Sequence, residues 1–162
     1  MVATHHHSDH IGGVRAYLAV GARLATTPDG TEVARRMAAV SSTLAPNPVA
    51  GRDVEGQLVE VRDRFIIGEG ERRVGVIRNP PSPHVEEMVL GYVPHVQAVY
   101  VADLYAVPET VVYPPTSLTV RFAEVLDELG LEVETIVPTH GLVGSRAGLD
   151  RALEAMDVEH RG

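Results

Sequence analysis

The chain contains no cysteine, no lysine and no tryptophan among its 162 residues. Without cysteine there is no disulfide framework, no thiolate nucleophile and no cysteine-ligated metal, so metal chemistry must use histidine and carboxylate ligands. No apolar run approaches the roughly 20 residues of a membrane span, and the N-terminus lacks the charged and apolar regions of a signal peptide. We therefore expect a cytoplasmic protein without a membrane-spanning segment.

Positive charge is also scarce. The net charge is −8, and all fourteen basic residues are arginines, scattered apart from the pairs Arg35-Arg36 and Arg72-Arg73. A surface for nucleic acid or an anionic membrane needs clustered basic residues to neutralise phosphate, so we expect neither partner. The length suits one domain with a core of adequate size, and we expect a single domain over residues 1–162.

Residues 4–13, Thr-His-His-His-Ser-Asp-His-Ile-Gly-Gly, concentrate histidine and carboxylate groups. His5 and His7 are two apart, so on an extended segment both side chains leave one face, and Asp9 continues that face if the extension persists. His10 breaks the period, which predicts a turn before the glycine pair and a following helix. An expression tag would be an uninterrupted histidine run. Because imidazole and carboxylate are ligands of zinc and similar divalent ions, the stretch predicts a metal site.

Apolar periodicity predicts a mixed α/β chain. Helical spacing indicates helices over residues 13–22, 28–40, 118–129 and from 145 onward. Short apolar runs indicate strands over residues 23–26, 57–61, 65–67, 73–78, 88–93, 98–102 and 135–137. We expect the second, third and fourth of these strands to form one β-meander, and the next two to form a hairpin. Val33, Met37 and Val40 are the predicted apolar stripe of the second helix.

Two stretches predict loops. Residues 41–56 hold two prolines, two glycines and no clear period, and both a plain connector and a substrate-facing lid are open interpretations. Residues 79–83, Asn-Pro-Pro-Ser-Pro, cannot continue a strand, because proline has no amide donor and restricts the residue before it. We therefore expect a stiff loop that presents His84.

Further potential ligands follow the predicted strands. Asp103 and His140 each come directly after a short apolar strand, and His84 follows another on its proline loop. Ligands at the ends of several strands can build a metal site along one sheet edge. Taken singly, each also has an ordinary interpretation as a loop histidine, a turn cap or a strand exit. His95 and His160 have no ligand-type neighbour at useful spacing and are not assigned to the site.

These pieces resemble a known signature. Residues 4–13 resemble the Thr-His-x-His-x-Asp-His-x-Gly-Gly motif of the metallo-β-lactamase fold superfamily. The later matches follow in order: Pro-His84, acidic residues and a Val-Leu-Gly-Tyr-Val-Pro strand, then Tyr-Val-Ala-Asp103-Leu, then Val-Pro-Thr-His140-Gly. The resemblance runs from Thr4 to about Gly141. It implies an α/β (α+β) fold of the αββα sandwich type.

By matching positions, the resemblance implies two metal ions. The implied ligands are His5, His7 and His84 for one ion, Asp9, His10 and His140 for the second, and Asp103 as the bridge. A histidine at the second motif position favours zinc, since the family's di-iron flavoproteins have an acidic residue there. The expected cofactors are therefore two Zn²⁺ ions, with one iron as the alternative.

The resemblance also implies hydrolysis. Two zinc ions lower the pKa of a bridging water toward neutrality and polarise a substrate carbonyl, while Asp9 is expected to orient the hydroxide and pass its proton to the leaving group. Partners that hold the ligand histidines are expected nearby in the chain, with His6, Ser8 and Thr139 as candidates.

The chain departs from the family in one respect, because family members normally carry several strands before the first motif and three residues precede Thr4 here. We expect the N-terminal part of one sheet to be missing, so that residues 1–162 are the larger, C-terminal part of the domain. The remaining sheet would then expose an apolar face, which predicts a homo-oligomer or a partner that covers it.

Several substrate classes are disfavoured. Glyoxalase-II-like thioesterases carry a helical domain after the last histidine, whereas twenty-two residues follow His140, so glutathione thioesters are not expected. The acidic chain shows no basic groove for a nuclease, and β-lactamases with an active-site cysteine are excluded by composition. The expected substrate is a small ester, thioester or lactone. Two alternatives stay open: a mononuclear iron dioxygenase of this fold, and an inactive or truncated domain that binds metal or a partner.

Overall fold

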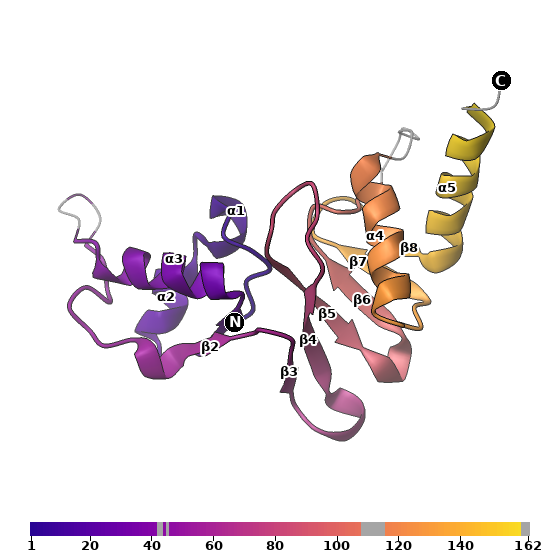
Figure 1. The fold of residues 1–162 in the computed structure, drawn as a ribbon. Helices are drawn as coiled ribbons and strands as arrows, with labels where there is room; N and C mark the ends of the chain where they lie inside the picture. The colour runs from indigo at the N-terminus through magenta and orange to yellow at the C-terminus, as the bar shows by residue number, and fades with distance from the viewer. Residues whose placement is uncertain (42–43, 45, 108–115, 160–162) are drawn as a thin grey trace.

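The computed structural model describes residues 1–41, 44, 46–107 and 116–159, which form two packed sheets with helices outside them (Figure 1). In the smaller sheet, β1 (Leu24–Thr26) pairs in parallel with β2 (Leu58–Glu60), and Val2 bridges to Ala25. The larger sheet contains, in order, β3 (Arg64–Ile67), β4 (Val74–Asn79), β5 (Met88–Val93), β6 (Ala98–Val101), β7 (Thr135–Pro138) and β8 (Gly144–Ser145). Only β6 and β7 are parallel neighbours among these described strands.

Helices cover the outer face of each sheet. The smaller sheet carries α2 (Val14–Ala19) and α3 (Pro28–Ala39), and the larger carries α4 (Ser117–Glu128) and α5 (Arg146–Glu159) (Figure 1). α3 begins where the Thr27 hydroxyl accepts the N–H of Gly30 and proline suits the first turn. α4 begins with a capping box between Thr116 and Thr119. The layers are therefore αββα, as the sequence predicts.

The deepest packing lies between the larger sheet and α4. Phe122 and Leu126 of α4 and Ile136 of β7 are fully buried there. Complete burial of one such side chain contributes about 1.5–3 kcal/mol, so this layer holds β6 and β7 firmly. A smaller cluster of Ala25, Val61, Val76 and Val89 joins the two sheets.

The strand directions bring the predicted ligands to one edge. β4, β6 and β7 all run the same way, because β5 is antiparallel to both of its neighbours and β7 is parallel to β6. The segments that follow these three strands therefore leave from the same side of the larger sheet. They carry His84, Asp103 and His140.

One prediction about strand pairing is wrong, and one about burial holds only in part. β2 does not join β3 and β4 in a meander, because it pairs with β1 and the chain crosses to the larger sheet around Val61. The antiparallel run is instead β3 to β6. On α3, Val33 and Met37 pack against the core as predicted, whereas Val40 lies exposed beyond the last turn. The buried positions of this helix are the small residues Gly30, Thr31, Ala34 and Ala38.

The loop between α3 and β2 is a connector in its described part. Its Asn47 side chain donates hydrogen bonds to the carbonyls of Met37, Ala38 and Val40, and so holds the C-terminal end of α3. Val49 and Val54 are buried against the helices, and η1 (Glu55–Gln57) leads into β2. The described part of this loop therefore packs against α2 and α3.

The face of the larger sheet opposite α4 is partly uncovered. Tyr100 of β6 is 40% exposed there, and its hydroxyl hydrogen-bonds the Thr139 hydroxyl at 2.7 Å. An oligomer or partner that covers this face stays a prediction. Within the described ranges, no helix combines the length and apolar character that crossing a bilayer requires.

Candidate metal centre

The first histidine motif leaves the smaller sheet and bends directly into α1 (Ser8–Ile11). His5 is completely buried, and His7 lies beside it with ring centroids 4.5 Å apart. The extension ends at His7 and Asp9 belongs to the helical turn, so Asp9 does not continue the face of His5 and His7. The helix begins at Ser8 and carries Asp9 and His10 together to a different part of the site.

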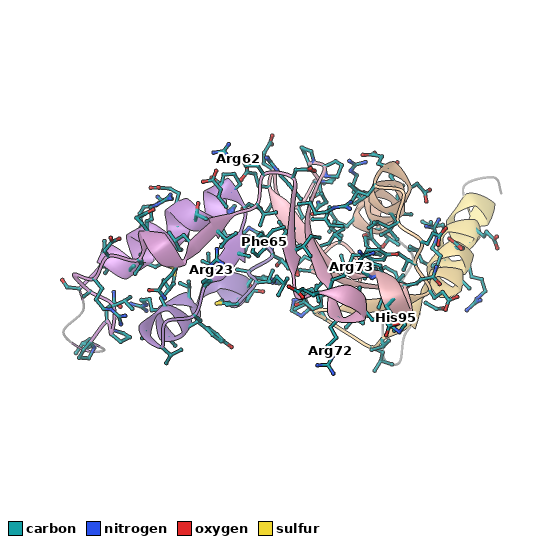
Figure 2. The ribbon with its side chains drawn as sticks, turned by 90° about the horizontal axis from the view of Figure 1, so that it is seen from below. Arg23, Arg62, Phe65, Arg72, Arg73 and His95 are labelled. Carbon is teal, nitrogen blue, oxygen red and sulfur yellow. The ribbon has the colours of Figure 1, made fainter. Side chains whose placement is uncertain are left out.

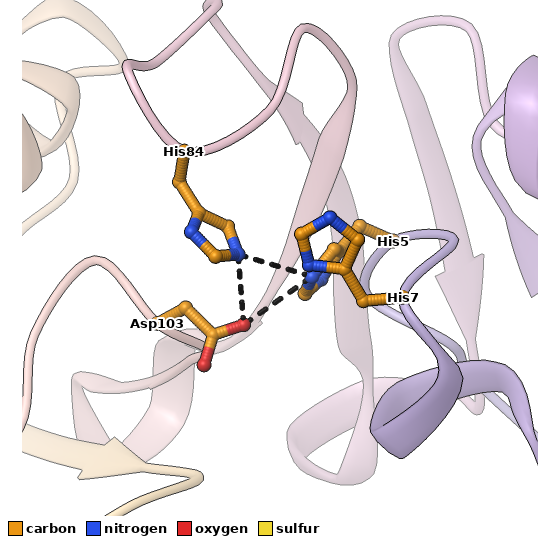
Figure 3. Close-up of side chains that lie close together, drawn as sticks. All are labelled: His5, His7, His84 and Asp103. Carbon is orange, nitrogen blue, oxygen red and sulfur yellow. Dashed lines mark hydrogen bonds and ion pairs between the residues drawn. The ribbon is translucent and has the colours of Figure 1, made fainter.

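Figure 3 shows the first group of side chains converging from three segments. The Nε2 atoms of His5 and His84 are 3.3 Å apart. Asp103 Oδ2 lies 3.3 Å from Nε2 of His5 and 3.2 Å from Nε2 of His84. A ligand atom of His7 lies within 4.8 Å of these three. Four predicted ligands thus meet, although almost 100 residues separate His5 from Asp103.

The spacing within this group fits a metal ion. A tetrahedral zinc with nitrogen and oxygen ligands at about 2.0–2.1 Å separates its ligand atoms by about 3.3 Å. The three distances among His5, His84 and Asp103 are 3.2–3.3 Å. In addition, the buried Nε2 of His10 has no hydrogen-bond partner among the described residues. This nitrogen lies 2.9 Å from Asp103 Oδ2 without making a hydrogen bond to it, and a divalent ion between the two groups would satisfy both.

The second group comprises Asp9, His10 and His140. Asp9 Oδ2 lies 3.2 Å from Nε2 of His10 and 4.0 Å from Nε2 of His140. Asp103 contacts this group too, because its Oδ2 is 2.9 Å from His10 Nε2 and its Oδ1 is 3.2 Å from His140 Nε2. The Asp9 and His140 side chains are 61% and 57% exposed, so this side of the site opens to solvent.

Asp103 holds this central position in a strained backbone conformation. Its φ of 50° lies in the left-handed region, which is uncommon for residues other than glycine, asparagine and aspartate. Buried Ala102 and Leu104 flank it and keep the turn in place. Such strain persists only where the surroundings enforce it, and it concentrates at functional sites.

Burial and neighbouring groups set the protonation of two residues. Burial, reinforced by the nearby His10, lowers the pKa of His5 to about 4, although Asp103 opposes this shift. His5 is therefore a neutral imidazole at physiological pH, which is the form that binds metal. The backbone N–H of Asp9 itself lowers the pKa of the Asp9 carboxyl, so this group is a carboxylate at neutral pH.

Thr4 makes contacts with two predicted ligands that sequence reasoning missed. Its buried hydroxyl lies 3.1 Å from Nδ1 of His5 and 3.2 Å from Nδ1 of His10. A hydroxyl oxygen has two acceptor sites, so both rings can donate to it and turn their unprotonated Nε2 atoms inward. The Thr4 carbonyl also accepts the N–H of Val89 on β5. One side chain therefore orients a histidine in each group.

The residues expected to hold the ligand histidines do not contact them. His6 faces Asp29 at 3.7 Å, and Thr139 bonds Tyr100, so neither holds a ligand histidine. Ser8 is exposed in α1, and no hydrogen bond from its side chain to a histidine is found among the described residues. Proximity in sequence is a weak guide here, because each of these side chains finds another partner or points to solvent.

Replacing Thr4 with valine should weaken metal binding at both groups by about 10–100-fold, because the isosteric side chain leaves both Nδ1 atoms without an acceptor. Zinc affinity is measured by competition with a chelating dye. Thr4→Ser keeps the hydroxyl and should retain most of the affinity. Equal affinities for the valine and wild-type chains would show that Thr4 does not orient the ligands.

The low pKa of His5 predicts that the metal-free chain loses stability on acidification. Below pH 6.5 the unfolded chain takes up a proton at this residue, whereas the folded chain takes it up only near pH 4. The free energy of unfolding of EDTA-treated protein should therefore fall by up to about 3 kcal/mol across this window. Urea titrations at several pH values measure it. His95→Gln, at an exposed site, should leave the pH dependence of the free energy of unfolding unchanged. A free energy of unfolding that does not change with pH would contradict the low pKa of His5.

Comparison with known proteins identifies the family of the chain. A family model described as the metallo-beta-lactamase superfamily matches residues 1–140. The chain belongs to this superfamily. The resemblance found in the sequence is thereby confirmed. No curated protein matches the chain significantly.

Solved structures of metallo-beta-lactamases share the fold. One from Pontibacter korlensis has a TM-score of 0.60 at 18% identity, over 96% of this chain and 67% of that one. One from Hirschia baltica has a TM-score of 0.58 at 15% identity, over 96% and 66%. FIM-1 from Pseudomonas aeruginosa, in its mono-zinc form, has a TM-score of 0.60 at 16% identity, over 98% and 66%. This superfamily member thus spans about two thirds of the length of these neighbours.

Proposed function

We propose that the chain is a metal-dependent hydrolase that uses two zinc ions on a small ester, thioester or lactone. The observation that carries this proposal is the double contact of Asp103, whose two carboxylate oxygens lie within 3.3 Å of histidines from both groups. One carboxylate between two sets of imidazoles is suited to bridge two ions. Membership of a superfamily with metal-binding hydrolases supports the same reading.

The donor set matches the chemistry of zinc. Five imidazoles and two carboxylates neutralise only half the charge of two divalent ions, so the site keeps a net positive charge. Bound there, the ions would lower the pKa of water toward neutrality and polarise a substrate carbonyl. His5 and His10 are held by Thr4 and serve as fixed ligands.

Asp9 is the residue proposed to handle the proton. Its carboxylate is exposed, ionised at neutral pH and 3.2 Å from His10. It can therefore orient the attacking water by accepting a hydrogen bond, and it can pass a proton to the leaving group on the open side. The exposed His140 lines the same side.

Metal analysis of the purified chain tests this proposal. Protein produced with zinc should contain about two zinc ions per chain, and His84→Ala should reduce this to about one or none. His95→Ala is the matched control, because His95 lies on η3 (Pro94–Val96) and faces Glu71. It should retain both ions and full hydrolysis of ester, thioester and lactone substrates.

Other outcomes identify the alternatives. One iron per chain would replace this proposal with a mononuclear dioxygenase, and two zinc ions without turnover of any substrate would indicate a metal-binding domain that is not a hydrolase. Unchanged metal content in His84→Ala would remove that residue from the site.

A further inference from the structure

β3 forms the free edge of the larger sheet (Figure 1). β4 pairs with one side of it, from Arg64 opposite Ile77 to Ile67 opposite Val74, and no strand of the described chain pairs with the other side. Ile66 and Ile67 are 48% and 40% exposed and point to opposite faces of the sheet. A free edge with exposed apolar side chains is a template for another strand.

A groove accompanies this edge. It has a volume of about 480 Å³, lies between β3, β4 and the C-terminal end of α4, and is lined by Arg64, Arg73, Ile66, Ile77, Leu129 and Leu131. We call these residues the β3 groove. Its volume is enough to receive several side chains, and its walls combine an apolar floor with cationic margins. A strand added to β3 would point every second side chain into it.

The cationic margins have no carboxylate partners. Arg62, directly before β3, pairs with Glu60, and ion pairs elsewhere hold Arg35, Arg36, Arg78, Arg121 and Arg146. Within the described ranges no ion pair is found for Arg64 and Arg73, which line the groove, or for Arg23 and Arg72 nearby, and the same holds for Arg15, Arg52 and Arg151 away from β3. What distinguishes the groove is that its lining includes two arginines and no carboxylate. Figure 2 shows Arg23, Arg72 and Arg73 on the same side of the molecule.

The groove is cationic although the protein is acidic. The net charge is −8, yet the side chains that line the groove include Arg64 and Arg73 and no carboxylate. Arg23 lies over the ring of Phe65, with its guanidinium 5.9 Å from the ring centroid. Unpaired cations beside an open strand edge favour an occupant that is both extended and negatively charged.

We propose that β3 binds an extended acidic segment of another protein, which pairs with the free edge as an additional strand. Alternate apolar side chains of the segment occupy the β3 groove, and its carboxylates pair with Arg64 and Arg73. The proposal requires no metal and does not depend on the proposed hydrolase.

Two other occupants fit less well. A second copy related by a two-fold axis through β3 would place Arg64 opposite Ile67 of the other strand and would add a second set of the same arginines, so it supplies no opposite charge for them. A single-stranded nucleic acid would use the arginines but not the amide edge, and it needs exposed aromatic rings for stacking. Phe65 is only half-exposed and already faces Arg23.

Binding of a designed peptide tests the proposal. The probe is a capped, fluorescent nonapeptide that alternates valine with glutamate, titrated into the full chain at low salt. We expect saturable binding that weakens at least about tenfold in the double variant Arg64→Glu, Arg73→Glu, and about tenfold in 0.5 M salt. Arg36→Glu is the matched control, because it reverses an exposed arginine on α3 and should leave binding unchanged.

Two further probes separate the contribution of charge from that of backbone pairing. A peptide with lysine in place of glutamate should not bind, and a peptide with alternate amides N-methylated along its pairing edge should lose at least about tenfold in affinity. Equal binding of the N-methylated peptide would rule out strand pairing. Tighter binding of oligo-dT, or a dimer in light scattering that Arg64→Glu abolishes, would overturn the assignment to an acidic polypeptide. The melting temperature of each variant verifies that it is folded.

Discussion

Asp103→Asn should reduce the metal content from about two ions to less than one per chain and lower kcat/KM by at least about 10³-fold, or about 4 kcal/mol. The reason is the position of the carboxylate, which touches histidines of both groups. Removal of its charge weakens the binding of both ions together. Elemental analysis and ester hydrolysis measure the two effects.

Asparagine is the informative substitution at this position. It keeps the volume of the side chain and tolerates the φ of 50°, so the backbone turn and the fold are preserved. Asp63→Asn, at an exposed position before β3, is the control and should change neither metal content nor rate. If Asp103→Asn retained both ions and its activity, Asp103 would not bridge the groups.

Gly141→Ala should destabilise the chain by roughly 3 kcal/mol or more and remove the ion held by His140. The residue has a φ of 91°, and a Cβ atom there would overlap the carbonyl oxygen of Val107. Relief of this overlap requires backbone movement directly after His140, which would displace its ring from Asp9 and Asp103. Chemical denaturation and metal analysis measure the two effects.

Gly130→Ala separates the effect of a positive φ from the effect of the Cβ overlap. Gly130 also has a positive φ, of 60°, but no heavy atom lies within 4 Å of an added Cβ. This control should therefore cost only about 1 kcal/mol and leave the metal content unchanged. A Gly141→Ala chain as stable as Gly130→Ala would show that the loop after β7 adjusts freely.

Much of the ligand set could be predicted because its signals are local. His84 follows a run of prolines that must end a strand, and Asp103 and His140 follow short apolar runs. The structure brings these three to one sheet edge together with the first motif. The role of each residue as a metal ligand stays a prediction until metal is measured.

Contacts that depend on the layers could not be predicted. The expected meander failed because β2 is too short to reveal its partner, and its parallel pairing with β1 depends on the crossover of the chain. The Thr4 contact was missed because it needs His10 to fold back through α1 onto a residue six positions earlier. The arginines are scattered in sequence, and their common location around β3 depends on the β3–β4 hairpin and β1.

The sequence by itself determined the family, the αββα class and the kinds of donor, since histidine and carboxylate spacing and proline positions act over a few residues. The resemblance implied Asp103 as the bridge, and the tertiary structure supplied its contacts to both groups. Only the tertiary structure decided that Thr4 lies against two histidines and that β3 is a charged free edge. These features join residues far apart in the chain, so they follow from strand direction and sheet packing, which local patterns do not specify.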